Sequence, residues 1–220
     1  MREQLQKDFE NIIKNLTLSQ KDIEIKKFCL NNFIDKGFPN RKEEDWRFSD
    51  LNQIIKKNIG ELSFYCDYTS TNKVDTSVFV DGLEHNKIVF INGRIEKIDF
   101  DYEKKNQIEI VDQSETINKF SSNNSLSDLN NAFTNKSFKI LVNKGYQLKK
   151  PLIIYHTTNS KIWSKNINLR LDFELDKDSS LRIVDLFKEA SEKNFLNIFY
   201  NFNLKENAIL KNYKIDKFEN

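Results

Sequence analysis

Three adjacent carboxylates are the most concentrated reactive group in the sequence. Glu43-Glu44-Asp45 supplies the side-chain type that acts as a general acid or base and that binds hard metal ions. Neighbouring side chains on a helix or loop point in different directions, so three carboxylates in a row do not converge on one atom. We therefore interpret this run as a solvated face.

The histidines and cysteines are isolated from one another. His85 lies in a polar turn and His156 ends an apolar run, so we predict histidines at the surface or at a strand end rather than metal ligands. Cys29 falls in a predicted helix and Cys66 ends a predicted strand. We predict two buried free thiols, because the cysteines are too few and too far apart for a zinc or cluster motif. The sequence leaves a disulfide open.

The sequence patterns of several common enzyme classes are absent. The five glycines form no phosphate-binding loop, and there is no serine elbow, H-E-x-x-H motif or catalytic Cys/His spacing. We accordingly predict no catalytic residues, no cofactor-binding residues and no metal ligands. The chain is expected not to be an enzyme by itself.

The composition is that of a folded protein with balanced charge. Of 220 residues, 38% are hydrophobic and 31% charged, which is enough apolar material for one large domain or two small ones. The net charge is +2 from 35 basic and 33 acidic residues, which argues against a nucleic-acid partner. No apolar stretch reaches signal-peptide or membrane-spanning length. We expect no membrane association and a cytoplasmic location.

The first 60 residues are predicted to be helical. Ser19 is placed to cap a second helix that ends at Gly37, just before Pro39. Ser49 is expected to cap a short third helix over residues 50–58. The first helix is indicated by an apolar stripe at spacings of three and four residues: Phe9, Ile12, Ile13 and Leu16.

From about residue 62 the apolar residues come in runs of strand length. Asn92-Gly93 between two such runs predicts a tight hairpin. A helix is predicted over Leu126–Phe133, with Ser125 or Ser127 as its cap. The predicted strands are Ser77–Val80, Ile88–Ile91, Ile95–Phe100, Ile108–Val111, Phe138–Val142, Leu152–His156, Ile167–Leu175, Leu181–Phe187, Phe195–Leu204 and Ala208–Ile215.

Strict alternation is clearest in Ile167–Leu175. Apolar residues occupy the odd positions, and Asn168, Arg170, Asp172 and Glu174 the even ones, so the two sets point to opposite faces of a strand. Successive strands about a dozen residues apart are typical of a sandwich, a barrel or a β-solenoid. Periodicity does not choose among these three architectures.

Several segments together resemble the SufD family, whose members are scaffold subunits for iron–sulfur cluster assembly. The most specific is Gly37–Leu51, GFPNRKEEDWRFSDL, which matches the family's Gly-x-Pro element and the charged, Trp-containing run that follows it. Four others follow in the family's order: Ile88–Arg94, Leu129–Phe133, Leu148–Ile153 and Glu206–Leu210. The resemblance covers the chain from about residue 20, and it covers the amino-terminal half of the family's usual length.

This resemblance implies an α+β fold that is mainly β. An amino-terminal helical domain (1–60) would be followed by a linking β segment with a hairpin (61–125) and by the start of a right-handed β-helix, a solenoid (126–220), truncated at its carboxy-terminal end. It implies a cytoplasmic complex with SufB-like and SufC-like subunits that supports cluster biogenesis and iron acquisition. The iron–sulfur cluster would belong to the assembled complex, and its ligands would lie beyond Asn220, so none is assigned to a position here.

Arg41, Trp46 and Arg47 are the interaction or domain-packing candidates within the Gly37–Leu51 segment. Trp and Arg are favoured at the energetic centres of interfaces, but we prefer a Trp46 that packs the helical domain onto the β-domain. Two other functions stay open. One is a polysaccharide-active enzyme on a solenoid or sandwich, with Asp and Glu as acid and base; the other is SufB, the paralogous subunit.

Overall fold

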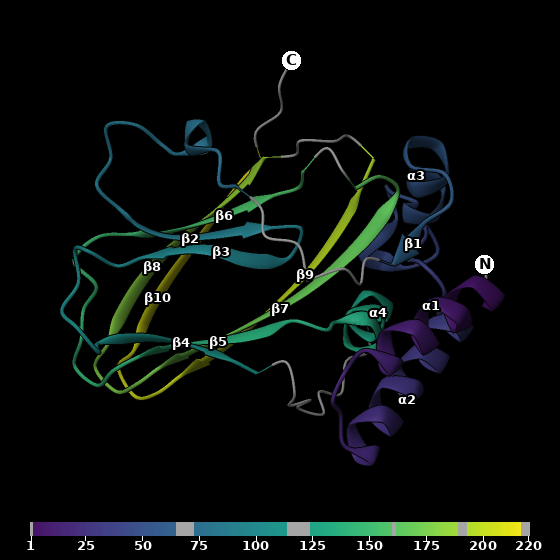
Figure 1. The fold of residues 1–220 in the computed structure, drawn as a ribbon, viewed down its shortest axis with the longest axis horizontal. Coiled ribbons are helices and arrows are strands. Elements are labelled where there is room, and N and C mark those ends of the chain that lie inside the picture. Colours follow the sequence, from purple (N-terminus) through teal and green to yellow (C-terminus); the bar gives the residue numbers. More distant parts are fainter. Residues whose placement is uncertain (1, 65–72, 114–123, 160–161, 189–192, 217–220) are drawn as a thin grey trace.

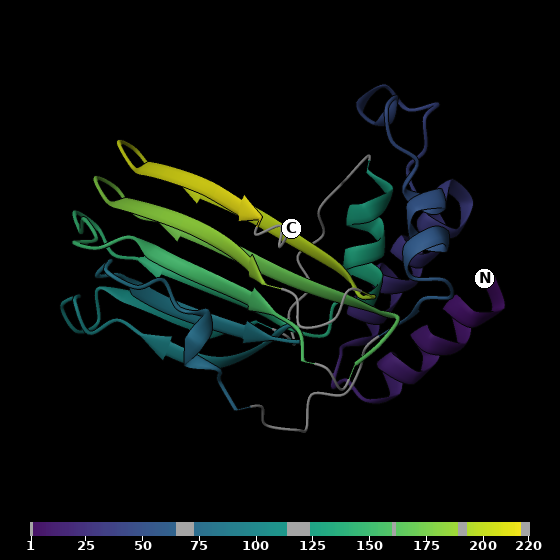
Figure 2. The ribbon, with the colours of Figure 1, turned by 90° about the horizontal axis from the view of Figure 1, so that it is seen from above.

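The computed structural model describes residues 2–64, 73–113, 124–159, 162–188 and 193–216 (Figure 1). In these residues the fold is mixed α+β and mostly sheet, with four α-helices and two mixed sheets. The coarse prediction of an α+β, mainly β chain is thereby confirmed. The helices gather on one side of the sheets, as Figure 2 shows.

The helices are α1 (Arg2–Lys14), α2 (Gln20–Lys36), α3 (Leu51–Asn58) and α4 (Ser125–Phe133). The predicted ends of α2 are confirmed. The Ser19 hydroxyl accepts the backbone N–H of Asp22, and Gly37 ends the helix with φ 72°, a conformation that favours glycine.

The predicted caps of α3 and α4 are wrong. Asp50, and not Ser49, caps α3, because its carboxylate accepts the backbone N–H three residues on at 2.9 Å. Asn124 caps α4, where Ser125 or Ser127 was predicted, and its side-chain oxygen accepts an N–H at 2.8 Å. In both cases an Asx side chain stands one position before the first helical residue, where its extended backbone suits the cap.

The strands are β1 (Ser63–Phe64), β2 (Asn86–Ile91), β3 (Arg94–Asp99), β4 (Ile108–Asp112), β5 (Ser137–Val142), β6 (Leu152–Thr157), β7 (Lys165–Leu175), β8 (Ser180–Lys188), β9 (Phe195–Leu204) and β10 (Ile209–Asp216). The predicted strand Ser77–Val80 is wrong. Residues Thr76–Val78 form a 3-10 turn instead, because the Asp75 carboxylate accepts the Ser77 N–H and closes the backbone there.

The two sheets are built by strands that alternate between them. One sheet runs β4-β5-β7-β9, with β1 also on β7, and the other runs β3-β2-β6-β8-β10. From β5 to β10, consecutive strands belong alternately to the first and the second sheet. Each strand from β5 to β8 pairs in parallel with the strand two places further along the chain. In the β7–β9 pair, Asn168 lies beside Asn197, 29 residues later. Only the pairs β2–β3 and β4–β5 are antiparallel in the described chain.

Three larger apolar clusters and a small fourth one, Ile162 with Ile167, hold the described residues together. The largest fills the space between the two sheets. A second joins α1, α2, α3 and α4 with β1, and a third lies on the outer face of the second sheet, under residues 74–80. The helical cluster takes residues from both sides of the predicted boundary at residue 60, since α4 packs on α2. The domain division itself stays a prediction.

Strand β7 is buried on both of its faces. Its apolar residues point into the space between the sheets, as the alternation predicts. The opposite face is also covered: Asn168, Arg170 and Asp172 are only 3%, 6% and 4% exposed. Helix α4 lies over this face. An alternating strand usually has one solvated face, so β7 carries a buried polar layer that its pattern does not reveal.

The β2–β3 hairpin confirms the Asn-Gly turn and provides a first stability prediction. Asn92 and Gly93 have φ 53° and 78°, as a two-residue turn requires. A Cβ atom added at Gly93 would stand 2.9 Å from Ile167 Cγ2 on β7. We expect Gly93→Ala to lower the free energy of unfolding by about 2 kcal/mol, from the left-handed backbone and the displaced isoleucine.

Denaturant melts of the two proteins check this value. Gly145→Ala is the matched control, because Gly145 also has positive φ (69°) but has nothing within 4 Å of the added Cβ. The difference between the two variants isolates the contact with Ile167. Equal losses would contradict a role for that contact.

Candidate functional site

The predicted interaction residues lie in the loop between α2 and α3. Trp46 ends a 3-10 helix, Glu44–Trp46, and its half-buried ring packs against the cluster of the amino-terminal helices. Arg41 and Arg47 are exposed, and the Arg47 guanidinium lies 4.6 Å from the ring centre of Phe48, which is 81% exposed. Of the three candidates only Trp46 reaches that cluster. Its role in packing or docking stays a prediction.

The three adjacent carboxylates do not form a site. Glu43, Glu44 and Asp45 are all exposed, as the interpretation of a solvated face requires. Glu43 accepts the backbone N–H of Asn40 at 3.2 Å and so closes the turn that leads into the 3-10 helix. Among the residues that the structure describes, no group of three or more His, Cys, Asp or Glu side chains is arranged to hold a metal ion.

A polar cluster that sequence reasoning missed lies between the two sheets. It is formed by His156 of β6, Asp185 of β8 and Tyr200 of β9. His156 Nε2 lies 2.9 Å from the Tyr200 oxygen and 3.3 Å from Asp185 Oδ1, and Tyr200 donates its proton to the same carboxylate oxygen. We call these three side chains the inter-sheet triad.

The hydrogen bonds of the triad indicate which of its groups donate and which accept. The Tyr200 proton points to a carboxylate that can only accept, so the Tyr200 oxygen must accept from His156 Nε2–H. Burial, and next the nearby Asp185 charge, raise the pKa of Tyr200 well above its ordinary value. Tyr200 is therefore a permanent donor at neutral pH. The prediction of a strand-end histidine places His156 correctly, but the residue is buried, at 2% exposure.

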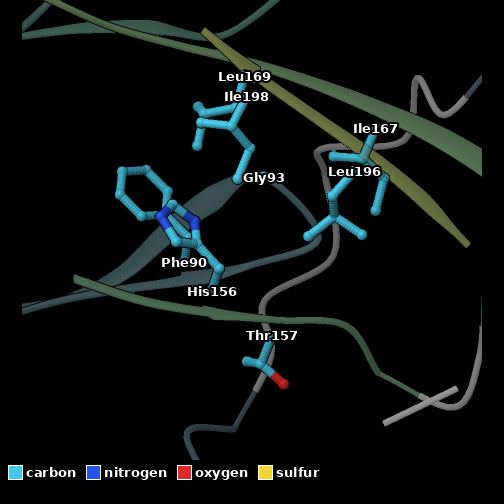
Figure 3. Close-up of a pocket in the computed structure, with 8 residues that line it drawn as sticks. All are labelled: Phe90, Gly93, His156, Thr157, Ile167, Leu169, Leu196 and Ile198. Carbon is cyan, nitrogen blue, oxygen red and sulfur yellow. The ribbon is translucent and has the colours of Figure 1, made fainter. Parts of the chain in front are cut away.

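Aromatic rings and a small cavity lie next to His156. The His156 ring stacks between Phe90 at 5.4 Å and Phe187 at 4.8 Å, measured between ring centres. Figure 3 shows His156 and Phe90 facing apolar side chains of β7 and β9 across this cavity. Its volume is about 10 Å³, which is room for about one water molecule. The cavity is lined by Phe90, Gly93, His156, Thr157, Ile167, Leu169, Leu196 and Ile198.

His85 is also buried, which corrects the prediction of a surface histidine. Its Nδ1 donates to the Leu83 carbonyl at 2.6 Å, so its Nε2 must accept the Tyr155 hydroxyl at 2.7 Å. Tyr155 in turn accepts the backbone N–H of Val80 at 3.1 Å. Burial lowers the pKa of His85, so the ring stays neutral. This series of hydrogen bonds fastens the loop before β2 to the outer face of the second sheet.

A buried lysine connects the amino-terminal helices to α4. Lys26 of α2 is 2% exposed, and its ammonium donates to three carbonyls at the carboxy-terminal end of α4: Asn131 at 3.0 Å, Ala132 at 3.4 Å and Thr134. Burial lowers the pKa of Lys26 to about 7. The carbonyls and the negative end of the helix dipole favour the charged form and partly oppose this shift.

Cys29 lies on the same helix as Lys26 and is a buried free thiol, as predicted. Burial, with a smaller contribution from the Asp128 carboxylate, raises its pKa to about 11. The thiol is therefore protonated and unreactive at neutral pH. Cys66 lies outside the described residues.

The opposite side of α4 is fixed to the sheet by polar side chains. Asn130 donates to the carbonyls of Leu169 on β7 and Asn197 on β9, at 3.1 and 2.7 Å. Asn131 accepts from Arg170 at 3.1 Å, and Arg170 also pairs with Asp172 at 3.2 Å. The family-like segment Leu129–Phe133 is thus a helix that binds two strands at once. Two adjacent Asn residues inside a predicted helix were the available signal, since Asn is a poor helix former.

Comparison with known proteins does not assign this chain to a family. No protein-family model matches the chain, and no curated protein matches it. Among the helices that the structure describes, none is long and apolar enough to cross a membrane. The described polar clusters connect elements far apart in the sequence, and their direct effect is to hold helices and strands together.

Proposed function

We propose that this chain is a scaffold subunit of the SufD type, acting in the cytoplasm with SufB-like and SufC-like subunits to support iron–sulfur cluster biogenesis and iron acquisition. The cluster is the product of the assembled complex in this proposal, and the chain itself performs no catalysis. The ordered set of family-like segments, from Gly37–Leu51 to Glu206–Leu210, carries the proposal.

The strand pairing supports the finer fold that the proposal includes, a right-handed β-helix. In a solenoid each coil stacks on the preceding one, so strands of successive coils pair in parallel at similar offsets. Here β7 pairs with β9, and β8 with β10, at an offset of 29 residues, while β6 pairs with β8 at an offset of 31 residues and β5 with β7 at 33. The positions of the family-like segments also agree with structural roles: Leu129–Phe133 fixes α4 to the sheet, and Asn92-Gly93 turns the hairpin.

Co-expression with SufB-like and SufC-like proteins from the same genome tests the function. We expect the tagged 220-residue chain to retain the SufB-like subunit through gel filtration. A matched variant pair, Arg47→Ala and Arg182→Ala, compares the exposed loop between α2 and α3 with an exposed arginine on β8. Failure to retain either subunit at micromolar concentrations, together with cleavage of acidic polysaccharides, would replace the scaffold proposal by the enzyme alternative.

A further inference from the structure

The segment between the 3-10 helix Thr76–Val78 and β2 lies on the outer face of the second sheet and is attached to it at both ends. At its start, Phe79 and Val80 are half-buried against the outer apolar cluster. At its end, His85 is 2% exposed. The residues between these two points, 81–84, are exposed. We call residues 79–85 the strap.

One hydroxyl group of the sheet holds both ends of the strap. The oxygen of Tyr155, on β6, accepts the backbone N–H of Val80 at 3.1 Å and lies 2.7 Å from His85 Nε2. The Phe79 ring packs on the same tyrosine, with 5.1 Å between the ring centres. Any change that breaks the bond between Tyr155 and His85 therefore loosens the end of the strap that leads into β2.

The closed arrangement requires a neutral His85. Its Nδ1–H donates to the Leu83 carbonyl, so Nε2 accepts the Tyr155 proton only while it carries no proton of its own. A protonated ring would donate to the Tyr155 oxygen instead, and the Tyr155 proton would lose its acceptor although this side chain is only 1% exposed. A buried donor without a partner is costly, and the cost disappears when the strap leaves the sheet and both groups reach water.

The charges that face His85 from the sheet do not favour a protonated ring. Burial lowers the pKa of His85, the Leu83 carbonyl opposes this shift, and Lys87 of β2 lowers the pKa further. Asp99 of β3 acts in the opposite direction, with the smallest effect of the four. Its carboxylate is also paired with Lys87 at 3.3 Å and with Lys97 at 4.0 Å. The ring is therefore neutral while the strap is closed.

The charged groups within the strap act on its other contacts. Burial, and to a lesser extent the Asp81 carboxylate, raise the pKa of Tyr155, so the tyrosine keeps its proton and stays a donor. Glu84 pairs with Lys150 at 2.6 Å, and an exposed ion pair of this kind contributes little to stability. The strap thus depends on the contacts of Tyr155 rather than on its surface charges.

We propose that the strap is a proton-operated cover: protonation of His85 releases residues 79–85 from Tyr155 and uncovers the outer apolar cluster of the second sheet. The residues beneath it are each 5% exposed or less while the strap is closed: Val89, Ile91, Ile153, Tyr155 and Leu186. The released state presents an apolar surface that the closed state hides. The proposal does not rest on the proposed function.

The direction of the pH dependence follows from the two states of His85. The ring has its ordinary pKa of about 6.5 when the strap is open and a lower pKa when the strap is closed. Above about pH 6.5 both states are neutral, and opening does not depend on pH. Below it the open state binds a proton that the closed state does not, so the ratio of open to closed rises by up to about tenfold per pH unit. The rise ends at the pKa of the closed state.

Hydrogen exchange at the Val80 amide measures this opening, because the N–H is bonded to Tyr155 while the strap is closed. We expect its protection factor to be constant above about pH 6.5 and to fall by up to about tenfold per pH unit below it. The Gly37 amide, which donates to the Phe33 carbonyl at 2.7 Å among the helices, should keep a constant protection factor. Binding of a dye that fluoresces on apolar surfaces should rise as the Val80 protection falls.

His85→Gln is the matched variant, because its amide can donate to Leu83 and accept from Tyr155 but cannot titrate. Its Val80 protection should be constant between about pH 5 and about pH 8. Nuclear magnetic resonance of the wild-type His85 ring is an independent measurement, which should show the Nδ1–H tautomer at neutral pH and a titration midpoint below about 6.5. Constant Val80 protection in the wild type, an equal fall in His85→Gln, a parallel fall at Gly37, or a midpoint that is not lowered would each overturn the proposal.

Discussion

Replacing Asp185 by alanine is expected to lower the free energy of unfolding by about 3–5 kcal/mol, the largest single-residue effect that the structure predicts. Asp185 is 1% exposed, and one of its oxygens serves both Tyr200 and His156. Its removal would leave the Tyr200 O–H and the His156 N–H to compete for the few acceptor atoms that remain in a buried site. Buried donors without partners are costly because they lose the hydrogen bonds that they made to water in the unfolded chain.

Denaturant melts of three variants separate this effect from a general loss of charge. Asp185→Asn keeps an acceptor oxygen and should cost about 1–2 kcal/mol, the range expected when one strong hydrogen bond is weakened. Asp101→Ala, at an exposed aspartate, should stay within about 0.5 kcal/mol. Tyr200→Phe combined with Asp185→Ala should cost less than the sum of the single changes, because both remove the same hydrogen bond. Strict additivity would contradict a coupled triad.

Lys26→Met is expected to abolish a rise in stability between pH 7 and pH 9. The pKa of Lys26 is about 10.5 when exposed and about 7 in the folded chain. Above pH 7 the folded state has therefore released a proton that the unfolded state still holds, so stability increases with pH through this window and is flat below it. Two pH units correspond to about 2–3 kcal/mol.

The measurement is the difference in unfolding free energy between wild type and variant across that window, which cancels the titration of all other groups. Lys27→Met is the matched control, because Lys27 is the adjacent residue and is exposed. It should run parallel to wild type at every pH. If Lys26→Met also runs parallel, the ammonium stays fully charged in the fold, and the three α4 carbonyls outweigh its burial.

Local structure was predictable wherever a single stretch of chain contains the whole signal. The apolar stripe of α1, the Gly37 end of α2 and the Asn92-Gly93 turn depend on residues within a few positions of one another, and all three are confirmed. Cap residues were less predictable, because serine and Asx side chains compete for the same position. The run Ser77–Val80 looks like a strand by composition, but one local hydrogen bond from Asp75 turns it.

Burial of polar residues was not predictable, because it depends on what lies above them in space. The even positions of β7 alternate as a solvated face would, and only the position of α4 shows that they are covered. His85 and His156 each depend on a tyrosine at least 44 residues away in sequence. Neither partner can be identified from spacing alone, so the sequence left both histidines as isolated side chains.

The position of α4 between the other helices and the sheet also affects folding during synthesis of the chain. Lys26 reaches the Ala132 carbonyl, 106 residues later, and Asn130 reaches the Asn197 carbonyl, 67 residues later. At a synthesis rate of about 5–20 residues per second, the first two helices exist for about 5–20 s before α4 has been made. Their apolar side chains, Phe9, Ile12 and Phe33 among them, are uncovered during that interval. The ribosome must therefore deliver more than half of this chain before its beginning can become stable.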